Sequence, residues 1–437
     1  MNILAKKSTL HGTLIVPGSK SQTIRALLFA AFSKGESKIY NPLPSDDCLN
    51  ALRFIEKFGA RVSKEKNLWR VKGIGTKWKQ PDFVVDVGNS GTLLSFATAI
   101  LATIEGYSVI TGDASICTRP INDELSALRD LDCDAFATRK NIDAPPVIIN
   151  GAIHCGCAKL RGNISQYVSA LLVASSLIQG KTKIIVTEPK EIPFVKMTLA
   201  WLSELGVQVS YDEKKFSWYE IFGGNEFPSF TKTIPSDWSS ATFPLIAAIA
   251  SHSQLTLEHV DTSDVQGDKA IVNFLREMGA NIEYDESRAT VSVKQTNEAT
   301  TLHGIQTSLA DCPDVLPALS CIASFAEGDT ILSGVSICRL KETDRVSCMR
   351  KELSKLGVAC EEESDKLIIH GKGASSLHGA EIESYGDHRI AMAFASLALG
   401  LPSDEKLLIK NAECASVTFP NFYETLNALG ANFVETK

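Results

Sequence analysis

One short segment recurs along the whole 437-residue chain and limits its fold more than any other feature of the sequence. The clear copies read FIEKFGARV, WLSELGVQV, FLREMGANI, ELSKLGVAC and TLNALGANF, with central glycines Gly59, Gly206, Gly279, Gly357 and Gly430. A weaker sixth copy, ALRDLDCDA, has Asp132 in the glycine position. Successive copies are 73, 74, 73, 78 and 73 residues apart. We therefore expect six repeats of about 73 residues.

The repeated segment has the pattern of a helix followed by a strand. Apolar residues at positions i, i+3 and i+4 indicate an amphipathic helix, and a glycine at its end can take the left-handed conformation that terminates helices. A short alternating run follows each glycine, as in Ala60-Arg61-Val62, and alternation is typical of a half-buried strand. Each repeat is therefore predicted to be an α/β unit.

A second helix in each repeat is predicted to begin at a polar turn. The six turns contain Lys20, Ser90, Ile164, Asp237, Cys312 and Asp387, which are 70, 74, 73, 75 and 75 residues apart. Ser, Asn and Asp are good helix caps, and the N-terminus of a helix attracts anions through its unpaired N–H groups. Capped helices are common, so only the side chains on these turns can indicate a functional site.

Several of the turns carry charged side chains. Lys20 and Arg25 lie near the positive end of the first such helix, where cations are unfavourable, so we infer that an anion binds between them. The run 339–345 holds five charges in seven residues, a pattern that usually forms a solvated surface. His388 and Arg389 directly precede an apolar helix, where the alternatives are a binding site and a buried ion pair.

Composition excludes several classes of protein. The longest apolar runs, 93–104 and 390–401, have 12 residues each, whereas a membrane span needs about 20, so we expect buried helices and no membrane association. A net charge of −7 disfavours nucleic acid as a partner. Eleven irregularly spaced cysteines and no signal peptide indicate a cytoplasmic protein with reduced thiols. The close pair Cys155 and Cys157 lacks the further ligands of a zinc site, so no metal is expected.

Eight motifs, in order across nearly the whole chain, resemble the 5-enolpyruvylshikimate-3-phosphate synthase family of enolpyruvyl transferases. They are PGSKSQTIRALL, VGNSGT, GDASICTRPI, GNISQYVSALL, CPDVLPAL, RLKETDR, GDHRIAMAFA and TFPNF. The resemblance implies two inside-out α/β domains of three repeats each, which agrees with the six repeats. The first domain would be discontinuous, 1–17 plus 236–437, and the second would be 18–235. The active site would lie in the cleft between them.

The resemblance also implies a reaction. The enolpyruvyl group of phosphoenolpyruvate would be transferred to the 5-hydroxyl of shikimate 3-phosphate through a tetrahedral intermediate, with release of phosphate. Both substrates carry a phosphate and a carboxylate, which suits Arg, Lys and helix N-termini as binding groups. No metal or organic cofactor is implied, and we expect a monomer.

The family's motifs assign roles to residues of this chain. The shikimate 3-phosphate contacts would be Lys20, Ser21, Arg25, Ser165, Gln166, Asp314 and Lys341. The phosphoenolpyruvate contacts would be Lys20, Asn89, Gly91, Arg119, Gln166, Arg345 and Arg389. Asp314 would be the base facing the 5-hydroxyl, Glu342 would handle the methylene proton, and Lys20 and His388 would assist. Neighbouring cations would lower the pKa of the carboxylates and burial would raise it, so the outcome stays open.

Six positions depart from the family's pattern: Val417, Ser95, Cys117, Ile164, Ile337 and Glu191. Val417 and Ser95 stand where a Lys and an Arg are common, and Glu191 stands where a Ser contact is usual. Because a hydrogen bond to a charged group is worth about 1.5–3 kcal/mol, these changes predict weaker substrate binding.

Two alternatives stay open at this point. The sister family that transfers enolpyruvyl to a UDP-amino sugar carries Asn-Ala after the first lysine and a cysteine five residues before the Arg-Pro pair. Here Ser21 and Gln22 follow Lys20, and Ala114 stands at the cysteine position. The other alternative is a non-catalytic anion-binding paralogue, which the departures suggest. The presence of all four residues assigned to proton transfer argues against it.

Overall fold

The computed structural model describes residues 1–76, 78–294 and 301–436. The chain divides into two compact units. The first unit is discontinuous and comprises Met1–Pro17 and Pro235–Lys437, and the second unit is Gly18–Ile234. Among the described residues, no helix is long and apolar enough to cross a membrane.

Six four-stranded sheets are present in the described part of the chain, three in each unit, together with one two-stranded sheet of β3 (Ser33–Lys34) and β15 (Phe227–Pro228). Every four-stranded sheet has the same plan: one edge strand pairs in parallel with its neighbour, and the remaining pairs are antiparallel. This shared plan is the structural form of the repeat in the sequence.

The strands of the second unit, in sheet order, are as follows: β16 (Thr231–Thr233), β4 (Glu36–Tyr40), β6 (Leu68–Lys72), β5 (Arg61–Glu65); β7 (Val85–Asp86), β8 (Gly106–Thr111), β10 (Val147–Gly151), β9 (Asp134–Ala137); β11 (Cys157–Arg161), β12 (Gly180–Thr187), β14 (Trp218–Gly223), β13 (Val209–Tyr211). Those of the first unit are β18 (Ile282–Asp285), β19 (Thr290–Lys294), β17 (Gln254–Glu258), β2 (His11–Ile15); β20 (Gln306–Ser308), β21 (Glu327–Ser333), β23 (Lys366–Lys372), β22 (Ala359–Glu363); β24 (Ala380–Glu383), β25 (Lys406–Lys410), β1 (Asn2–Lys6), β26 (Phe433–Thr436).

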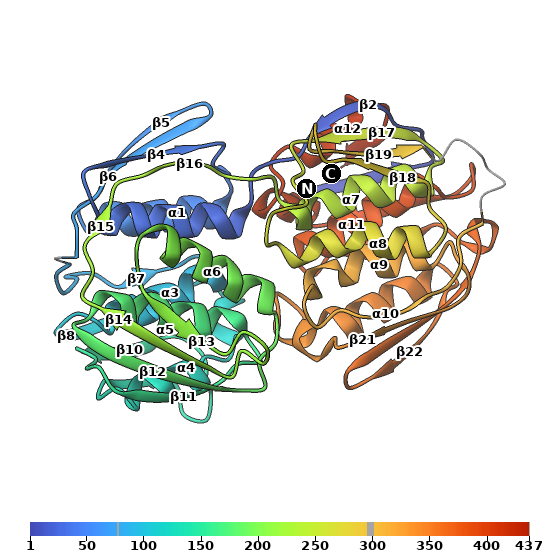
Figure 1. Ribbon diagram of the computed structural model, residues 1–437. Coiled ribbons are helices and arrows are strands. Elements are labelled where there is room, and N and C mark those ends of the chain that lie inside the picture. The colour runs from blue at the N-terminus through green and yellow to red at the C-terminus, as the bar shows by residue number, and fades with distance from the viewer. Residues whose placement is uncertain (77, 295–300, 437) are drawn as a thin grey trace. The chain divides into compact units, whose positions relative to one another are not determined.

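Three apolar helices pack against one another inside each unit, with the sheets on the outside (Figure 1). In the second unit these are α1 (Lys20–Phe32), α3 (Gly91–Leu101) and α5 (Ser165–Leu177), and in the first unit α7 (Trp238–Ala250), α9 (Leu316–Ala323) and α11 (His388–Ala398). Every residue of α3, α7 and α11 is buried. The predicted core helices at 93–104 and 390–401 are confirmed, although α3 and α11 end at Leu101 and Ala398.

The helix of each repeated segment ends at the predicted glycine stop or at Asp132. These helices are α2 (Asp46–Lys57), α4 (Asn122–Arg129), α6 (Ile192–Glu204), α8 (Ile271–Glu277), α10 (Arg345–Lys355) and α12 (Phe422–Asn427). The five repeat glycines have φ between 82° and 111°, and Asp132 takes the same left-handed conformation with φ 70°. The degenerate copy therefore keeps the backbone geometry without the glycine, since Asp tolerates this conformation better than most residues.

The chain crosses between the units twice, around residues 17–18 and 234–235. Strand β2 precedes α1 in the sequence, yet it pairs with β17, which follows α7. Conversely, β16 precedes α7 but pairs with β4, which follows α1. At the crossings the two units have thus exchanged the edge strands of one repeat each.

Candidate active site

The second unit places two of the predicted cations near the start of α1. Lys20 is the first residue of that helix, and its Nζ lies 3.1 Å from Oδ2 of the buried Asp47. Arg25 is one turn further along and only 2% exposed. Its guanidinium donates to Thr198 Oγ1 at 2.9 Å and to Ser21 O at 3.0 Å.

Arg25 is a buried cation without a matching carboxylate. Among the described residues it forms no ion pair, and burial lowers the pKa of its guanidinium to about 9. A buried, uncompensated charge is costly. Arg25 is therefore an internal cation that no carboxylate among the described residues neutralises, and the anion site at the start of α1 stays a prediction.

The start of α3 brings together four residues predicted on the phosphoenolpyruvate side. Gly91 opens α3, and a Cβ at this position would collide with the guanidinium of Arg119 and lie 3.7 Å from Gln166 Oε1. Asn89, two residues earlier, donates to Asp113 Oδ2 at 2.6 Å. The absence of a side chain at Gly91 leaves room for the Arg119 guanidinium to lie against the helix terminus.

The start of α5 is occupied by a carboxylate. Ser165 is the first residue of α5, and both its N–H and its hydroxyl donate to Glu191 Oε2, at 3.0 and 2.9 Å. Both residues are buried. Gln166, the next residue, donates to Thr92 Oγ1 at 3.1 Å, so α5 and α3 are joined at their N-termini.

In the first unit, Arg345 forms ion pairs with three carboxylates. Its guanidinium is 1% exposed and pairs with Asp314 at 2.7 Å, with Glu342 at 2.5 Å and with Asp387 at 2.7 Å. The run 339–345 is therefore only partly the solvated surface that its composition suggests. Leu340 is exposed and Lys341 is half-buried, whereas Arg345 is buried and paired with three carboxylates.

Asp314 is shared by two arginines. Its Oδ1 lies 2.7 Å from Arg345 Nη1, and its Oδ2 lies 3.0 Å from Arg389 Nη2. Burial alone would raise the pKa of Asp314, but the charges of Arg389, Lys341 and Arg345 outweigh it and hold the pKa well below its usual value. The sequence left open whether burial or neighbouring cations would dominate the pKa of the carboxylates. For Asp314 the cations dominate.

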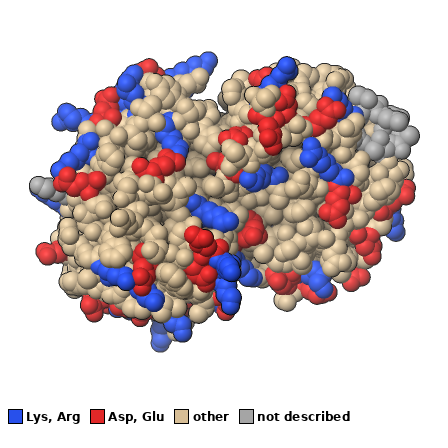
Figure 2. Space-filling view, in the orientation of Figure 1, with Lys and Arg blue, Asp and Glu red and all other residues tan. Residues whose placement is uncertain are grey.

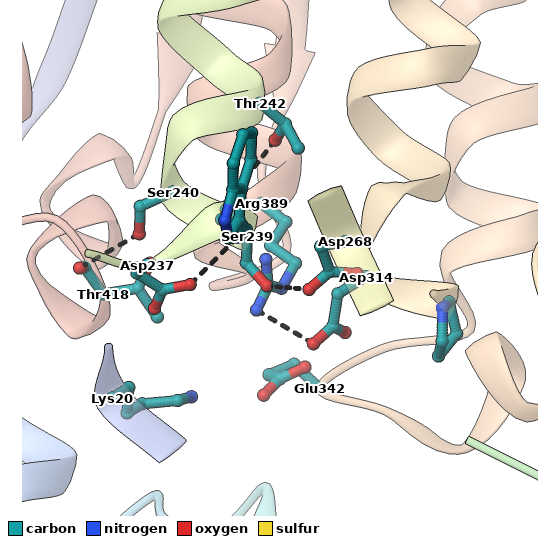
Figure 3. Close-up of polar contacts among 12 residues, drawn as sticks. Lys20, Asp237, Ser239, Ser240, Thr242, Asp268, Asp314, Glu342, Arg389 and Thr418 are labelled. Carbon is teal, nitrogen blue, oxygen red and sulfur yellow. Dashed lines mark hydrogen bonds and ion pairs between the residues drawn. The ribbon is translucent and has the colours of Figure 1, made fainter. Parts of the chain in front are cut away.

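A buried aspartate that sequence reasoning missed lies beside this pair. Asp268 belongs to the short helix η2 (Gly267–Ala270) and accepts a hydrogen bond from Ser239 Oγ in α7 (Figure 3). Burial and the negative charge of Asp314 raise the pKa of Asp268 to about 7. The buried Asp268 and the half-buried Asp314 therefore have pKa values shifted in opposite directions.

Asp387 was also missed as a site residue, although it stands in a motif that the sequence singled out. It caps α11 by accepting from the Arg389 N–H at 2.9 Å, and it pairs with Arg345. His388, the next residue, is 1% exposed. The ion-pair alternative for the Asp-His-Arg sequence is thus observed, and its role in binding stays a prediction.

Each unit therefore gathers its own set of predicted residues. In the second unit these are Lys20, Ser21, Arg25, Asn89, Gly91, Arg119, Ser165 and Gln166, and in the first unit Asp314, Lys341, Glu342, Arg345, His388 and Arg389. The signal that could have revealed Asp268 is its place in Gln266-Gly267-Asp268, a polar turn just before a helix.

Comparison with known proteins decides the family. The profile of EPSP synthase (3-phosphoshikimate 1-carboxyvinyltransferase) matches residues 4–426. The chain is 39% identical to a 3-phosphoshikimate 1-carboxyvinyltransferase of Ruminiclostridium cellulolyticum over 430 residues, which cover 98% of this chain and 99% of the relative. The chain belongs to the EPSP synthase family.

Further relatives and solved structures agree. A 3-phosphoshikimate 1-carboxyvinyltransferase of Methanocaldococcus jannaschii is 35% identical over 440 residues, covering 100% of this chain and 99% of the relative. The structure of EPSP synthase from Acinetobacter baumannii is similar with a TM-score of 0.82 at 28% identity, and both chains are fully covered. The enolpyruvyl transferase NikO from Streptomyces tendae has a TM-score of 0.79 at 16% identity, covering 100% of this chain and 98% of NikO, which shows the shared fold alone.

The structure also locates the departures from the family's pattern. Ile164 is the N-cap residue of α5 and makes no side-chain cap, and Glu191 supplies the carboxylate at that helix end. Ser95 is buried in α3, and burial raises the pKa of the nearby Glu124 carboxyl well above its usual value. Val417 ends the short helix η6 (Ala412–Val417).

The structure also shows how charged side chains and possible metal ligands are distributed. On the face seen in Figure 2, Lys and Arg are interspersed with Asp and Glu, which is consistent with a net charge of −7. Of the buried arginines, Arg345 and Arg389 are paired with carboxylates, whereas Arg25 forms no ion pair among the described residues. No group of three or more His, Cys, Asp or Glu side chains arranged for a metal ion occurs within the described ranges.

Proposed function

We propose that this protein transfers the enolpyruvyl group of phosphoenolpyruvate to the 5-hydroxyl of shikimate 3-phosphate and releases inorganic phosphate. The membership of the EPSP synthase family carries this proposal. The acceptor oxygen adds to C2 of phosphoenolpyruvate while the methylene carbon gains a proton. The acceptor hydroxyl gives up its proton in this addition. The resulting tetrahedral intermediate then loses a proton from its new methyl group and breaks the bond between C2 and the phosphate oxygen, which re-forms the double bond as an enol ether and releases phosphate.

The arginines of both units are proposed to bind the anionic groups of the two substrates. Arg345 and Arg389 lie against Asp314 in the first unit, and Arg119 lies against Gly91 at the start of α3 in the second. A planar guanidinium binds carboxylate and phosphate through two parallel hydrogen bonds, which suits this role. Asn89 and Gln166 add neutral donors to the same group.

Asp314 is proposed to accept the proton of the 5-hydroxyl. With its pKa held low by three cations, it is ionised at any physiological pH but is a weak base. Substrate anions that bind Arg345 and Arg389 would offset the positive charge that lowers the pKa of Asp314. The pKa of Asp314 would then rise toward the range in which a carboxylate is an effective base.

The remaining roles follow the family's motifs. Glu342 is proposed to transfer the proton at the methylene carbon. Its ion pair with Arg345, which also binds Asp314, supports this role. Lys20 and His388 are proposed to assist this proton transfer and the departure of phosphate. Ser21, Arg25, Ser165 and Lys341 complete the proposed contacts with shikimate 3-phosphate.

Phosphate release tests this function. The full-length chain is mixed with phosphoenolpyruvate and either shikimate 3-phosphate or UDP-N-acetylglucosamine, and free phosphate is measured with time. Turnover is expected with the first acceptor and not with the second. Turnover only with the UDP-sugar would favour the sister transferase, and no turnover with either, by a folded protein that still binds phosphoenolpyruvate, would favour a non-catalytic paralogue. We further propose a cytoplasmic monomer, which size-exclusion chromatography with light scattering tests for oligomeric state.

A further inference from the structure

The N-terminus of α5 already holds an anion that belongs to the protein. The helix has 13 residues and begins at Ser165, after an Ile164 that cannot cap it through its side chain. Glu191 Oε2 accepts from both the N–H and the hydroxyl of Ser165, at 3.0 and 2.9 Å. The Ser165 N–H and hydroxyl, which could donate to an external anion at this helix N-terminus, therefore already donate to Glu191.

The position of Glu191 is fixed by the backbone. It is the residue before α6 and lies in the left-handed region, with φ 52° and ψ 39°. Non-glycine residues in this region are uncommon and are held there by their surroundings. The side chain is only 1% exposed. An acidic side chain that is buried in this way at a helix N-terminus acts as a built-in substitute for a bound anion.

A cation without a carboxylate lies close to this built-in anion. Arg25 donates to Ser169 Oγ at 3.4 Å, one turn along α5 from Ser165. It also donates to Phe194 O at 3.2 Å in the first turn of α6, three residues after Glu191. Within the described residues, neither Glu191 nor any other carboxylate forms an ion pair with Arg25. The second unit thus has, at the first turns of α5 and α6, a buried cation without an ion pair and an internal anion that holds the Ser165 donors.

We propose that Glu191 determines the specificity of the acceptor subsite by competing with the acceptor's phosphate for the Ser165 donors. This inference rests on the proposed function, in which Ser165 and Arg25 contact shikimate 3-phosphate. A phosphate cannot accept from Ser165 while the Glu191 carboxylate occupies the same donors, and two adjacent anions repel each other. Binding of the phosphorylated acceptor therefore requires Glu191 to move away, which lowers the affinity for phosphate but not for the ring hydroxyls.

Isothermal titration calorimetry of the full-length chain with shikimate 3-phosphate and with unphosphorylated shikimate tests this competition. Glu191→Ser removes the carboxylate and restores a hydroxyl, and Glu191→Gln keeps the size while removing the charge. The matched control is Glu188→Gln, because Glu188 is three residues earlier, also has a positive φ of 53°, and pairs with the exposed Arg161. We expect both Glu191 variants to bind shikimate 3-phosphate about 10- to 100-fold more tightly, as a charged hydrogen-bonding competitor is removed. Shikimate affinity should change less than about threefold, and the control should match the parent protein.

Unchanged or weaker binding of shikimate 3-phosphate by both variants would overturn the inference and leave Glu191 a structural cap of α5. Thermal unfolding without ligand is measured in parallel, so that a folding defect in Glu191→Ser is recognised and Glu191→Gln then decides. Failure of the proposed function is distinguishable, because it appears as absence of phosphate release by the parent protein at saturating substrates. Tighter binding in the variants without turnover in the parent would support the competition and reject the reaction.

Discussion

Arg345 and Asp387 form an ion pair in which both side chains are buried: Nε lies 2.7 Å from Oδ2, and the two side chains are 1% and 0% exposed. Asp387 also caps α11, and Arg345 is the first residue of α10. One carboxylate therefore fixes the arginine that holds Asp314 and Glu342 and, at the same time, the helix that carries Arg389. The rigidity of the half-site in the first unit depends on this contact.

Asp387→Ala is expected to lower the free energy of unfolding by about 3–5 kcal/mol, because it leaves Arg345 buried with one carboxylate fewer. Chemical denaturation monitored by circular dichroism measures the change. Glu363→Ala is the matched control, since its ion pair with Lys366 at 3.0 Å is exposed and should be worth less than about 1 kcal/mol. A loss below 1 kcal/mol for Asp387→Ala would contradict the structural role given to this pair.

Asp314→Asn and Glu342→Gln should each reduce kcat by about 10²- to 10⁴-fold, the usual contribution of a positioned proton-transfer group. Binding of phosphoenolpyruvate should largely survive, because the arginines remain in place. Steady-state kinetics and calorimetry on the same preparations separate the two effects. Glu363→Gln, an exposed carboxylate of the same unit, serves as the control. If either variant keeps a near-normal kcat, the acid–base role given to that residue is wrong.

The contribution of Asp268 to the stability of the protein should fall as the pH rises from about 4 to about 7. Asp268 has an ordinary pKa of 3.8 when unfolded and about 7 when folded, so the folded state binds the proton more tightly, and this stabilisation is lost as the pH passes through the folded pKa. The slope for one proton is about 1.4 kcal/mol per pH unit. Asp268→Asn should remove this part of the slope between pH 5 and 7.

Urea denaturation at a series of pH values measures this difference between the parent protein and Asp268→Asn. Asp285→Asn is the control, because its hydrogen bond to Ser287 lowers the pKa of that exposed carboxyl and places its contribution below pH 4. Other groups, such as His370, titrate in both proteins and cancel in the comparison. Parallel stability curves for parent and Asp268→Asn would show that Asp268 is ionised throughout this range.

Arg25→Met should weaken binding of shikimate 3-phosphate by about 10- to 100-fold, the worth of one charge-assisted hydrogen bond. The stability of the ligand-free protein should change little, since removal of a buried charge without a carboxylate partner offsets the hydrogen bonds that are lost. Calorimetry and thermal unfolding measure the two quantities. Arg161→Met, which breaks only the exposed pair with Glu188, is the control. Unchanged affinity would mean that Arg25 is purely structural.

The repeat made most of the fold predictable from the sequence. Local patterns were enough, because the left-handed stop at Gly59 or Asp132 and the buried helix after Gly91 depend on residues close in the sequence. The motif at 386–389 likewise indicated a site. The family resemblance then supplied residue roles that the periodicity alone did not contain.

What the sequence could not predict depends on contacts between distant residues. Glu191 was recognised only as a departure, because nothing local places its carboxylate on Ser165, 26 residues earlier. Asp268 is distant from Asp314 in the sequence, so its raised pKa had no sequence signal. The balance at Asp314 required the positions of three cations at once. Electrostatics of this kind is a property of the folded chain.

The exchange of edge strands at the two crossings sets an order for synthesis on the ribosome. Strand β1 pairs with β25 and β26, and β2 pairs with β17, so both partners of β1 are made about 400 residues after it. The second unit, by contrast, is complete once residue 234 has emerged. We therefore expect the unit made in the middle to fold first, while β2 waits for β17 and β1 stays unpaired until the last strands of the nascent chain have emerged.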